Sequence, residues 1–405
     1  MPTDSAAISS LAKAIATTAE QIAKDENSTK EQLAALVASA EKLAIAAREP
    51  EENVYYIATQ IAQNAAIRSI IAMGVFDEMP LDGSPISVET LAARLKVNKE
   101  LLARFLRACS STHFFDEPAP LHYAHNALSR AYTRPENRAM TAQMYDFTCK
   151  GVFAIPEFGR QKGWTNAGNY NNGPFQLGAN TQLGFWEYLQ AVPERMQLFN
   201  AGMRAGTTIG SGKRSGVFPF GDILNQHPCK DGDDIAVVDV GGGRGQSLEA
   251  IHDDYPEIRG RLILQDLPHV IEDGKAKGLP PFIEAHVGSF FEPQTIKGAR
   301  IYYFRRIFHD WDQEQSKLIL ENTRLGMNSR SRVVIADMAL PDQWAPRDMA
   351  LQDLNMMSFG GMERTETQWK QLIESAGLVL RKIWQGEAGA KHSVIEAVLP
   401  EYEGF

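Results

Sequence analysis

A glycine-rich turn after an apolar run is the first feature of this sequence that could bind a ligand. The run IAVVDV (235–240) leads into Gly241, Gly242 and Gly243, and a helical pattern follows. Glycines at a strand-to-helix turn let the backbone approach a ligand closely, where a Cβ atom would block it. Asp239 would place a carboxylate beside the turn, where it attracts a cationic amino-acid group and repels a pyrophosphate.

A second acidic residue follows at the end of the next apolar run. The run RLILQDL (261–267) contains Asp266. A carboxylate about 20 residues beyond such a turn, at the end of the neighbouring strand, can accept hydrogen bonds from both ribose hydroxyls. The turn has no Lys or Arg at the positions that would bind phosphates. These features favour a nucleoside without phosphates, and S-adenosylmethionine is the best candidate; a dinucleotide is the alternative.

A histidine follows a third apolar run, ARIYYFRRIF (299–308). A histidine at the carboxyl end of a strand faces the crevice where ligands bind in parallel sheets. With its ordinary pKa near ~6.5, the imidazole of His309 can take a proton from a phenol near neutral pH. Asp337, at the end of VVIAD, and Glu363, in GGMERTE, are the acidic partners that we expect. One carboxylate on the imidazole would fix its tautomer. A purely structural histidine is the alternative.

The elements that must position these residues alternate in type after Asp231. Short β-branched runs are separated by helical patterns, which indicates an α/β domain with a mainly parallel sheet covered on both faces. The expected strands are 235–240, 261–267, 299–308, 332–340, 378–384 and 392–399, with helices near 246–254, 270–277, 312–325 and 366–376.

The N-terminal part of the chain has a mainly helical pattern. Residues 4–48 are rich in alanine and predict two helices, and residues 54–76 predict one long helix that ends at Gly74. Helices this apolar at the start of a chain must be covered. A partner subunit and the core of the same chain are both possible covers.

A winged-helix pattern comes next. Ser87 is placed as the N-cap of the helix 89–95, a second helix spans 99–109, and two short strands are expected near 114–116 and 121–125. This pattern is typical of DNA-binding domains. The second helix offers only three basic residues in a chain whose net charge is −9, so we expect no nucleic-acid partner.

The segment 136–225 reads as helical, with loops rich in Asn and Gly. Aromatic and methionine side chains recur in it, among them Phe147, Trp186 and Met203. Most such residues are core residues, but their place between two domains also suits the wall of a pocket for a flat, apolar substrate.

Length and composition set the limits of this interpretation. With 405 residues, 44% hydrophobic and 22% charged, the chain has the composition of a globular enzyme with two or three domains. We divide it into 1–135, 136–225 and 226–405. No stretch of 18 apolar residues predicts a membrane span, and the first residues do not resemble a secretion signal. Three scattered cysteines, Cys109, Cys149 and Cys229, have no metal-ligand spacing, so we expect no metal site and a cytoplasmic location.

Taken together and in order, these motifs resemble a known family. VVDVGGGRGQS, LILQDLPHVI, GSFFEP, FRRIFHDWDQEQ, VVIADMALPD and GGMERTETQWKQLIESAG are similar to motifs of the plant and fungal small-molecule O-methyltransferases of the caffeic-acid and flavonoid type, nearest to the fungal polyketide-tailoring branch. The resemblance covers nearly the whole chain. It implies a Rossmann-like class I methyltransferase domain that binds S-adenosylmethionine, a helical winged-helix dimerisation domain, a small-molecule substrate and a homodimer.

The resemblance also implies roles for individual residues. His309 would be the general base that deprotonates a substrate hydroxyl, flanked and oriented by Asp337 and Glu363. The expected cofactor-binding residues are Asp239, Gly241, Gly242, Gly243, Asp266 at the ribose, Leu267, Ser289, Phe290, Arg305 and, near the adenine, Trp311. The expected substrate-binding residues are Phe147, Trp186, Met203, Asp310 and Met356.

Two positions depart from the family pattern. Ser289 stands where relatives usually carry an Asp near the adenine amino group, and a neutral hydroxyl gives a weaker hydrogen bond than a carboxylate. Asp337 is one methylene shorter than the glutamate common in plant relatives. Some fungal members keep the cofactor but catalyse dehydration or pericyclic ring closure, which is the second functional hypothesis. The substrate skeleton and the hydroxyl that is methylated are left open by the sequence.

Overall fold

The computed structural model describes residues 5–24, 29–165, 172–206, 214–225, 234–386 and 393–403. The chain divides into two compact units, the first made of 1–149 with 187–209 and the second of 150–186 with 210–405. The segment 136–225, expected as one part of the chain, is thus divided between the two units. Cys229 lies outside the described residues.

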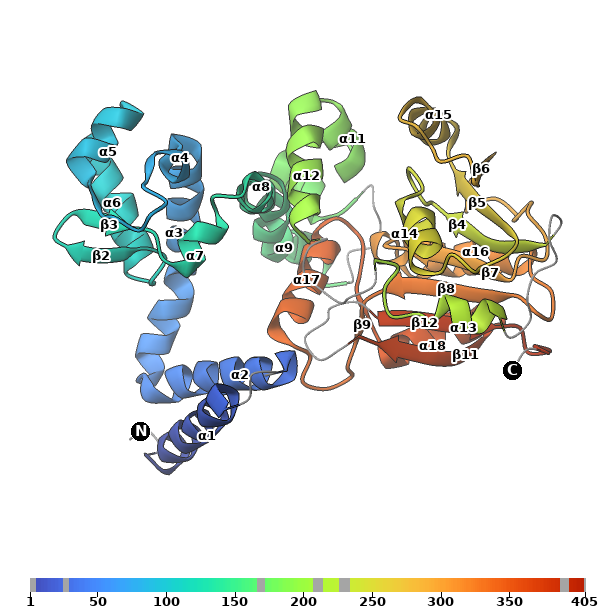
Figure 1. The fold of residues 1–405 in the computed structure, drawn as a ribbon, viewed down its shortest axis with the longest axis horizontal. Helices are drawn as coiled ribbons and strands as arrows, with labels where there is room; N and C mark the ends of the chain where they lie inside the picture. Colours follow the sequence, from blue (N-terminus) through green and yellow to red (C-terminus); the bar gives the residue numbers. More distant parts are fainter. Residues whose placement is uncertain are drawn as a thin grey trace. The chain divides into compact units, whose positions relative to one another are not determined.

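The first unit begins with three helices, α1 (Ser5–Lys24), α2 (Lys30–Ala47) and α3 (Pro50–Met73). Helices α1 and α2 pack against each other as a hairpin (Figure 1). Helix α3 ends as predicted at Gly74, whose left-handed backbone (φ 80°) lets its N–H donate to the carbonyls of the last turn. Val54, Tyr55 and Ile57 on α3 are 69–74% exposed, so an apolar face of this helix is left uncovered within the unit.

The predicted winged helix is present in the first unit. Ser87 and Asn98 cap its two helices through their side-chain oxygens, and strand β3 pairs antiparallel with both β1 and β2. The strand expected at 114–116 begins only at Asp116, because Phe114 and Phe115 are 2% exposed and pack against Phe76 instead. The elements are α4 (Val75–Glu78), β1 (Ile86–Ser87), α5 (Val88–Leu95), α6 (Lys99–Ser110), β2 (Asp116–Ala119), β3 (His122–Ala124) and α7 (Ala127–Ala131).

Two further helices complete the first unit. Helix α8 (Pro135–Gln143), which continues into a π-helical turn (Met144–Thr148), packs along α12 (Pro193–Gly206). A Cβ on Gly202 would lie 3.0 Å from the Cα of Met140, so glycine is required for this close approach.

The second unit is built on a seven-stranded sheet in the order β11-β12-β8-β7-β4-β5-β6. All pairs from β8 to β6 are parallel, whereas β12 runs antiparallel to β8 and to β11. The mainly parallel α/β sheet predicted from the sequence is confirmed. Its strands are β4 (Ile235–Val240), β5 (Arg261–Asp266), β6 (Ile283–Val287), β7 (Ile301–Arg305), β8 (Arg332–Asp337), β11 (Val379–Gln385) and β12 (Ser393–Val398).

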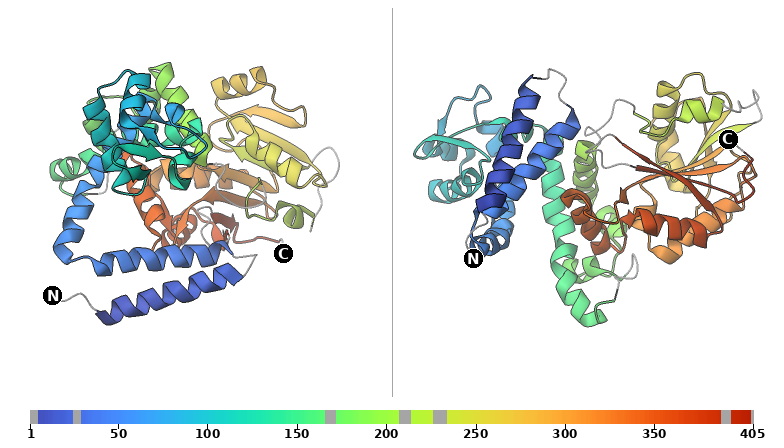
Figure 2. Two further views of the ribbon diagram at one scale, coloured as in Figure 1. Left: turned by 60° about the vertical axis from the view of Figure 1, so that its left-hand side comes forward. Right: turned by 90° about the horizontal axis from the view of Figure 1, so that it is seen from below.

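Helices cover both faces of this sheet (Figure 2). Alternate strand residues point to opposite faces. Val238 therefore packs with α16 and α18 in one core cluster, whereas Val237 packs with α13 and α14 in another. The helices that pack on the sheet are α13 (Phe220–Asn225), α14 (Gln246–Asp254), α15 (Pro268–Ala276), α16 (Gln313–Arg324) and α18 (Glu366–Ser375). Apart from α12, the other helices described after Thr148 are α9 (Cys149–Lys162), α10 (Pro174–Ala179), α17 (Arg347–Ser358) and α11 (Phe185–Gln190), which spans the boundary between the units.

Three details of the sheet differ from the sequence-based prediction. Strand β6 was missed, because IEAHV is short and only its first residue is buried. The run 299–308 is a strand only to Arg305 and then forms a 3-10 turn at Phe308–Asp310. The run 332–340 is two strands, β8 and the short β9 (Ala339–Leu340), and β9 pairs with β10 (Arg364–Thr365).

Candidate active site

The glycine turn lies at the carboxyl end of β4, in the middle of the sheet. Gly241 (φ 72°) and Gly243 (φ 63°) have left-handed backbones, which L side chains rarely adopt. The Gly241 N–H donates to the carbonyl of Gln265 on β5 at 2.8 Å. A Cβ on Gly241 would lie 2.8 Å from the Cδ1 of Ile307, two residues before His309. The turn is therefore in close contact with the segment that carries the histidine.

Asp239 is a fully buried carboxylate beneath this turn. Its side chain contacts the backbone of Gly242 so closely that a Cβ there would collide with it. Neither carboxylate oxygen accepts a hydrogen bond among the described residues. Burial raises the pKa of Asp239 to about 7, although the nearby charge of Arg305 opposes this rise. A buried carboxylate without a donor is costly, so Asp239 fits a ligand that brings a cationic group.

Asp266 lies at the end of β5 and faces the same turn. Its two oxygens accept hydrogen bonds from the N–H groups of Gly243 at 2.8 Å and Leu267 at 2.7 Å. Each carboxylate oxygen has two acceptor sites, so one site on each remains for neighbouring hydroxyls. Burial raises the pKa of Asp266. This arrangement suits the ribose contact that we expected, and the side chain of Leu267 is 43% exposed beside it.

A cluster of aromatic rings borders the turn. Phe290 lies 3.4 Å from the Cβ position of Gly241, and its ring packs edge-on against Phe291 with centroids 4.8 Å apart. Trp311 packs perpendicular to Phe291, also at 4.8 Å. Ser289 accepts a hydrogen bond from the Phe291 N–H at 3.2 Å, so its hydroxyl is already engaged in its own turn.

His309 lies in the 3-10 turn after β7, with a side chain that is 18% exposed. Its Nδ1 is 3.2 Å from Oε1 of Glu363, a carboxylate that is 1% exposed. This partner favours the tautomer with the proton on Nδ1. Nε2 lies 3.7 Å from Oδ1 of Asp310, beyond a good hydrogen bond. Nε2 therefore lacks a good hydrogen bond to Asp310.

The charges around His309 change its proton affinity. Burial by itself lowers the pKa of His309, but the carboxyl groups of Asp310, Asp337 and Glu363 outweigh burial and raise the pKa from 6.5 to about 10. The pKa of His309 thus departs from the ordinary value of an imidazole, and the three carboxyl groups favour its protonated form.

Asp337 forms its hydrogen bond with the backbone beside His309 and acts on the imidazole only through its charge. Its Oδ2 accepts a hydrogen bond from the Phe308 N–H at 3.0 Å, and its Oδ1 has no partner among the described residues. Burial raises the pKa of Asp337 to about 7. We expected both acids to flank the imidazole. In the structure only Glu363 forms a hydrogen bond with the imidazole, whereas Asp337 binds the backbone of Phe308, the residue before His309.

Sequence reasoning missed two residues that support this cluster. Arg364 is fully buried and donates to the carbonyls of Phe308 at 2.8 Å and Trp311 at 2.9 Å. Asp353 on α17 accepts a hydrogen bond from the Glu363 N–H at 2.8 Å. An arginine directly after Glu363 in the motif GGMERTE was visible in the sequence, but nothing in the pattern indicated that it would be buried.

The expected substrate-binding residues do not all lie in one unit. Phe147 (6% exposed) and the half-buried Met203 belong to the first unit. Trp186, whose ring packs 5.4 Å from Phe185, and Met356 (7% exposed) belong to the second, with Asp310. Within the second unit Phe185 and Phe359 pack with centroids only 4.0 Å apart, which makes a largely buried aromatic pair at the end of α17.

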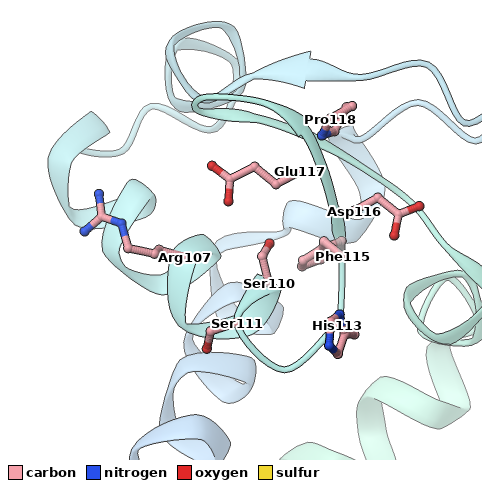
Figure 3. A pocket seen from close by; sticks show the side chains of 8 residues that line it. All are labelled: Arg107, Ser110, Ser111, His113, Phe115, Asp116, Glu117 and Pro118. Atoms are coloured by element: carbon pink, nitrogen blue, oxygen red, sulfur yellow. The ribbon is translucent and has the colours of Figure 1, made fainter.

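A separate pocket of about 420 Å³ lies in the first unit, between α6 and β2 (Figure 3). It contains none of the residues that the sequence singled out, and the side chains around it are of mixed charge: Arg107, Ser110, Ser111, His113, Phe115, Asp116, Glu117 and Pro118. Within the described ranges, no group of three or more His, Cys, Asp or Glu side chains is arranged to bind a metal ion. No described helix is long and apolar enough to cross a membrane.

Comparisons with known proteins cover both units. A family model for the O-methyltransferase domain matches residues 175–379, and a model for the O-methyltransferase dimerisation domain matches residues 55–135. An O-methyltransferase of Pestalotiopsis microspora is 54% identical over 405 residues, which is 100% of this chain and 99% of the relative. The structure of OxaC in complex with SAH and oxaline is 30% identical, with a TM-score of 0.84 over 97% of this chain and 99% of OxaC. A pericyclic reaction enzyme is 27% identical, with a TM-score of 0.82 over 96% of this chain and 99% of that protein.

Proposed function

The chain belongs to the S-adenosylmethionine-dependent O-methyltransferase family, and from this premise we propose that it methylates a hydroxyl group of an aromatic or polyketide-type secondary metabolite, with His309 as the general base. The contact between His309 and Glu363 is the observation that carries the proposal. His309 belongs to the same segment as Ile307, whose side chain borders the glycine turn at Gly241.

S-adenosylmethionine supplies an electrophilic methyl group on a cationic sulfonium. The residues that would bind it are Asp239 at its amino-acid end and Asp266 at its ribose, with Gly241 and Gly243 beneath it. The buried, unpaired carboxylate of Asp239 supports this assignment, because a cationic group there would remove an otherwise uncompensated burial cost.

The raised pKa of His309 suits a phenolic substrate. A phenol titrates near ~10, and the pKa of His309 is about 10. Transfer of the phenol proton to Nε2 would therefore be close to thermoneutral, while Glu363 stabilises the imidazolium that forms. Only the neutral imidazole can accept this proton. Activity should therefore rise with pH between 7 and 10.

Labelled methyl transfer tests this proposal. The protein is incubated with methyl-labelled S-adenosylmethionine and a panel of phenolic polyketides, and O-methylated products are identified by mass spectrometry. We expect a His309→Ala variant to lose about 10²–10⁴-fold in kcat. A His122→Ala variant is the control, because His122 is an exposed residue of the winged helix. Full activity of His309→Ala would refute the role of the base.

A second candidate function is pericyclic ring closure or dehydration with the cofactor bound but not consumed. The likeness to a pericyclic reaction enzyme favours it, as does the serine at position 289. In the same assay this function would give a product isomer or a dehydrated product that carries no label.

We also propose that the protein is a homodimer in which a second copy covers the exposed face of α3. The dimerisation-domain match begins at residue 55, among the exposed residues Val54, Tyr55 and Ile57. Light scattering should give the mass of a dimer for the native protein and of a monomer for an Ile57→Glu variant. A monomeric native protein would contradict this proposal.

A further inference from the structure

Arg364 is a buried guanidinium that binds backbone rather than an acid. It is completely buried, and its Nη2 donates to the carbonyls of Trp311 at 2.9 Å and Asp312 at 3.3 Å, while Nη1 donates to the carbonyl of Phe308 at 2.8 Å. All three carbonyls belong to the 308–312 loop. Nη2 also donates to the hydroxyl of Ser316 on α16 at 2.8 Å, so the loop is tied to the helix that follows it.

The choice of partners is unusual for a buried charge. Buried arginines are usually paired with a carboxylate, often through two hydrogen bonds. Among the described residues Arg364 forms no ion pair within 4.0 Å, although Asp337, Glu363, Asp312 and Asp353 are close enough to raise its proton affinity. Burial still lowers the pKa of Arg364, to about 10. A guanidinium with planar, fixed donors can bind several carbonyls at once, which a lysine cannot do.

The loop that Arg364 binds contains His309. The carbonyl of His309 accepts a hydrogen bond from the Met362 N–H at 2.9 Å, and the Phe308 N–H donates to Asp337. Backbone groups on both sides of the imidazole are therefore fixed. The residue before Arg364 is Glu363, which binds Nδ1 of the imidazole. Glu363 thus binds the ring of His309, and Arg364, the next residue, binds backbone carbonyls on either side of His309.

We propose that Arg364 is a positioning residue, which fixes the 308–312 loop so that His309 meets Glu363 through Nδ1 and keeps Nε2 for the substrate. The inference rests on the proposed role of His309 as the base. The geometry of the His309–Glu363 contact can nevertheless be measured without a substrate. Arg364 itself need not touch substrate or cofactor.

The pKa of His309 reports this geometry. It is raised by the charges that face the ring: Asp310 from its own turn, Asp337 from β8 and Glu363 from the segment before β10. Arg306, after β7, and Asp353, on α17, face the same carboxyl groups. If the loop is released, the ring leaves Glu363 and the pKa should fall toward its ordinary value near ~6.5.

The test uses the full-length, ligand-free protein with ¹⁵N-labelled histidine. The His309 signal is assigned from its loss in a His309→Gln variant and is followed by NMR as the pH is raised. Arg364→Met removes the donors at similar volume, and Arg364→Lys keeps the charge with a single ammonium. Arg332→Met is the matched control, because Arg332 is also a buried arginine on the sheet but is paired with Glu396.

We expect the pKa of His309 to fall by about two in Arg364→Met and by less in Arg364→Lys. With the phenolic acceptor found in the labelled assay, kcat should fall by about 100-fold, and KM for S-adenosylmethionine should also rise, because the released loop carries Trp311, an expected cofactor-binding residue. Arg332→Met should lower the melting temperature and leave both the pKa of His309 and the kcat of the folded enzyme unchanged.

An unchanged pKa of His309 in a folded Arg364→Met variant would overturn the inference. If that variant does not fold, Arg364→Lys decides in the same way. The proposed function fails separately: if His309→Ala keeps full activity but Arg364→Met lowers the pKa of His309, then His309 is not the base and Arg364 still positions the loop.

Discussion

Replacing Glu363 by glutamine changes one charge next to the imidazole and little else. Glu363 Oε1 lies 3.2 Å from His309 Nδ1, and its side chain is 1% exposed. Glutamine has the same shape, and the backbone N–H of residue 363 still donates to Asp353, because that hydrogen bond does not involve the side chain. The amide can bind Nδ1 either as acceptor or as donor. The variant therefore loses both the negative charge and the selection of one tautomer.

The size of the effect follows from the distance. At an effective dielectric constant of about 20, two unit charges 3.2 Å apart attract by about 5 kcal/mol. Each of these charges is spread over two atoms, so we take roughly half, about 2.5 kcal/mol, which corresponds to a fall of about two in the pKa of His309. When the proton sits on Nε2, that nitrogen cannot act as the base. We therefore expect kcat to fall by about 10²–10⁴-fold.

The assay is the dependence of kcat on pH, measured with labelled S-adenosylmethionine and the phenolic acceptor found for the native protein. In the native enzyme kcat should rise toward pH 10, because the pKa of His309 is about 10 and only the neutral imidazole accepts a proton. In Glu363→Gln the rise should be complete about two pH units lower, at a much smaller maximum. Calorimetry should show nearly unchanged binding of S-adenosylmethionine.

Glu366→Gln is the matched control. Glu366 lies three residues further on, at the start of α18, and its side chain accepts a hydrogen bond from Gln385 at the surface. We expect native kcat and a native pH profile for this variant. A Glu363→Gln variant with the same kcat and the same pH profile as Glu366→Gln would show that the His309–Glu363 contact does not set the activity of His309.

Further predictions concern the cofactor site and the stability of the ligand-free protein. Asp239→Asn should weaken S-adenosylmethionine binding about 10–100-fold in calorimetry. In the native protein that binding should strengthen as pH rises through about 7, where Asp239 loses its proton; affinity independent of pH would contradict this. Gly241→Ala should weaken binding, because alanine is strained at a φ of 72° and its Cβ would displace the Cδ1 of Ile307, whereas Gly278→Ala, with a similar φ (87°) and open space, should only lower the melting temperature; equal binding by both variants would exclude the steric argument. The melting temperature of the ligand-free protein should fall as pH rises. Folding raises the pKa of Asp239 from 3.8 to about 7 and that of His309 from 6.5 to about 10, so the folded protein binds protons more tightly than the unfolded chain. The stability that this tighter binding contributes is lost as pH rises through each of these two ranges. A melting temperature that rose with pH would be the opposite result.

Much of the fold was determined by local sequence patterns. The β-branched runs that contain Asp239, Asp266 and Asp337 near their ends are strands of one sheet, and Gly74 ends α3 where the helical pattern stops. Such runs are recognisable because a strand buried on both faces must be apolar throughout. Strand β6 was missed because only Ile283 is buried, so its sequence lacks this signal.

The candidate site was predictable as far as it depends on strand ends. The carboxyl ends of parallel strands meet at one edge of a sheet, so the sequence alone places Asp239, Asp266 and His309 there. The partner of the imidazole was not predictable, because Glu363 and Asp337 were equivalent candidates in the sequence. The packing of β10 against β9 decides between them: Nδ1 of His309 forms its hydrogen bond with Glu363, and Asp337 accepts a hydrogen bond from the Phe308 N–H.

The sequence by itself thus determined the order of the elements and the kinds of groups at the edge of the sheet. The tertiary structure alone decided which acid contacts His309 and how far the pKa of His309 is raised. It also decided that Arg364 is buried and binds the carbonyls of the 308–312 loop. The physical reason is that burial and distance set electrostatic energies. Both arise from contacts between segments remote in the chain, such as 308–312 and 361–364, which no local pattern records.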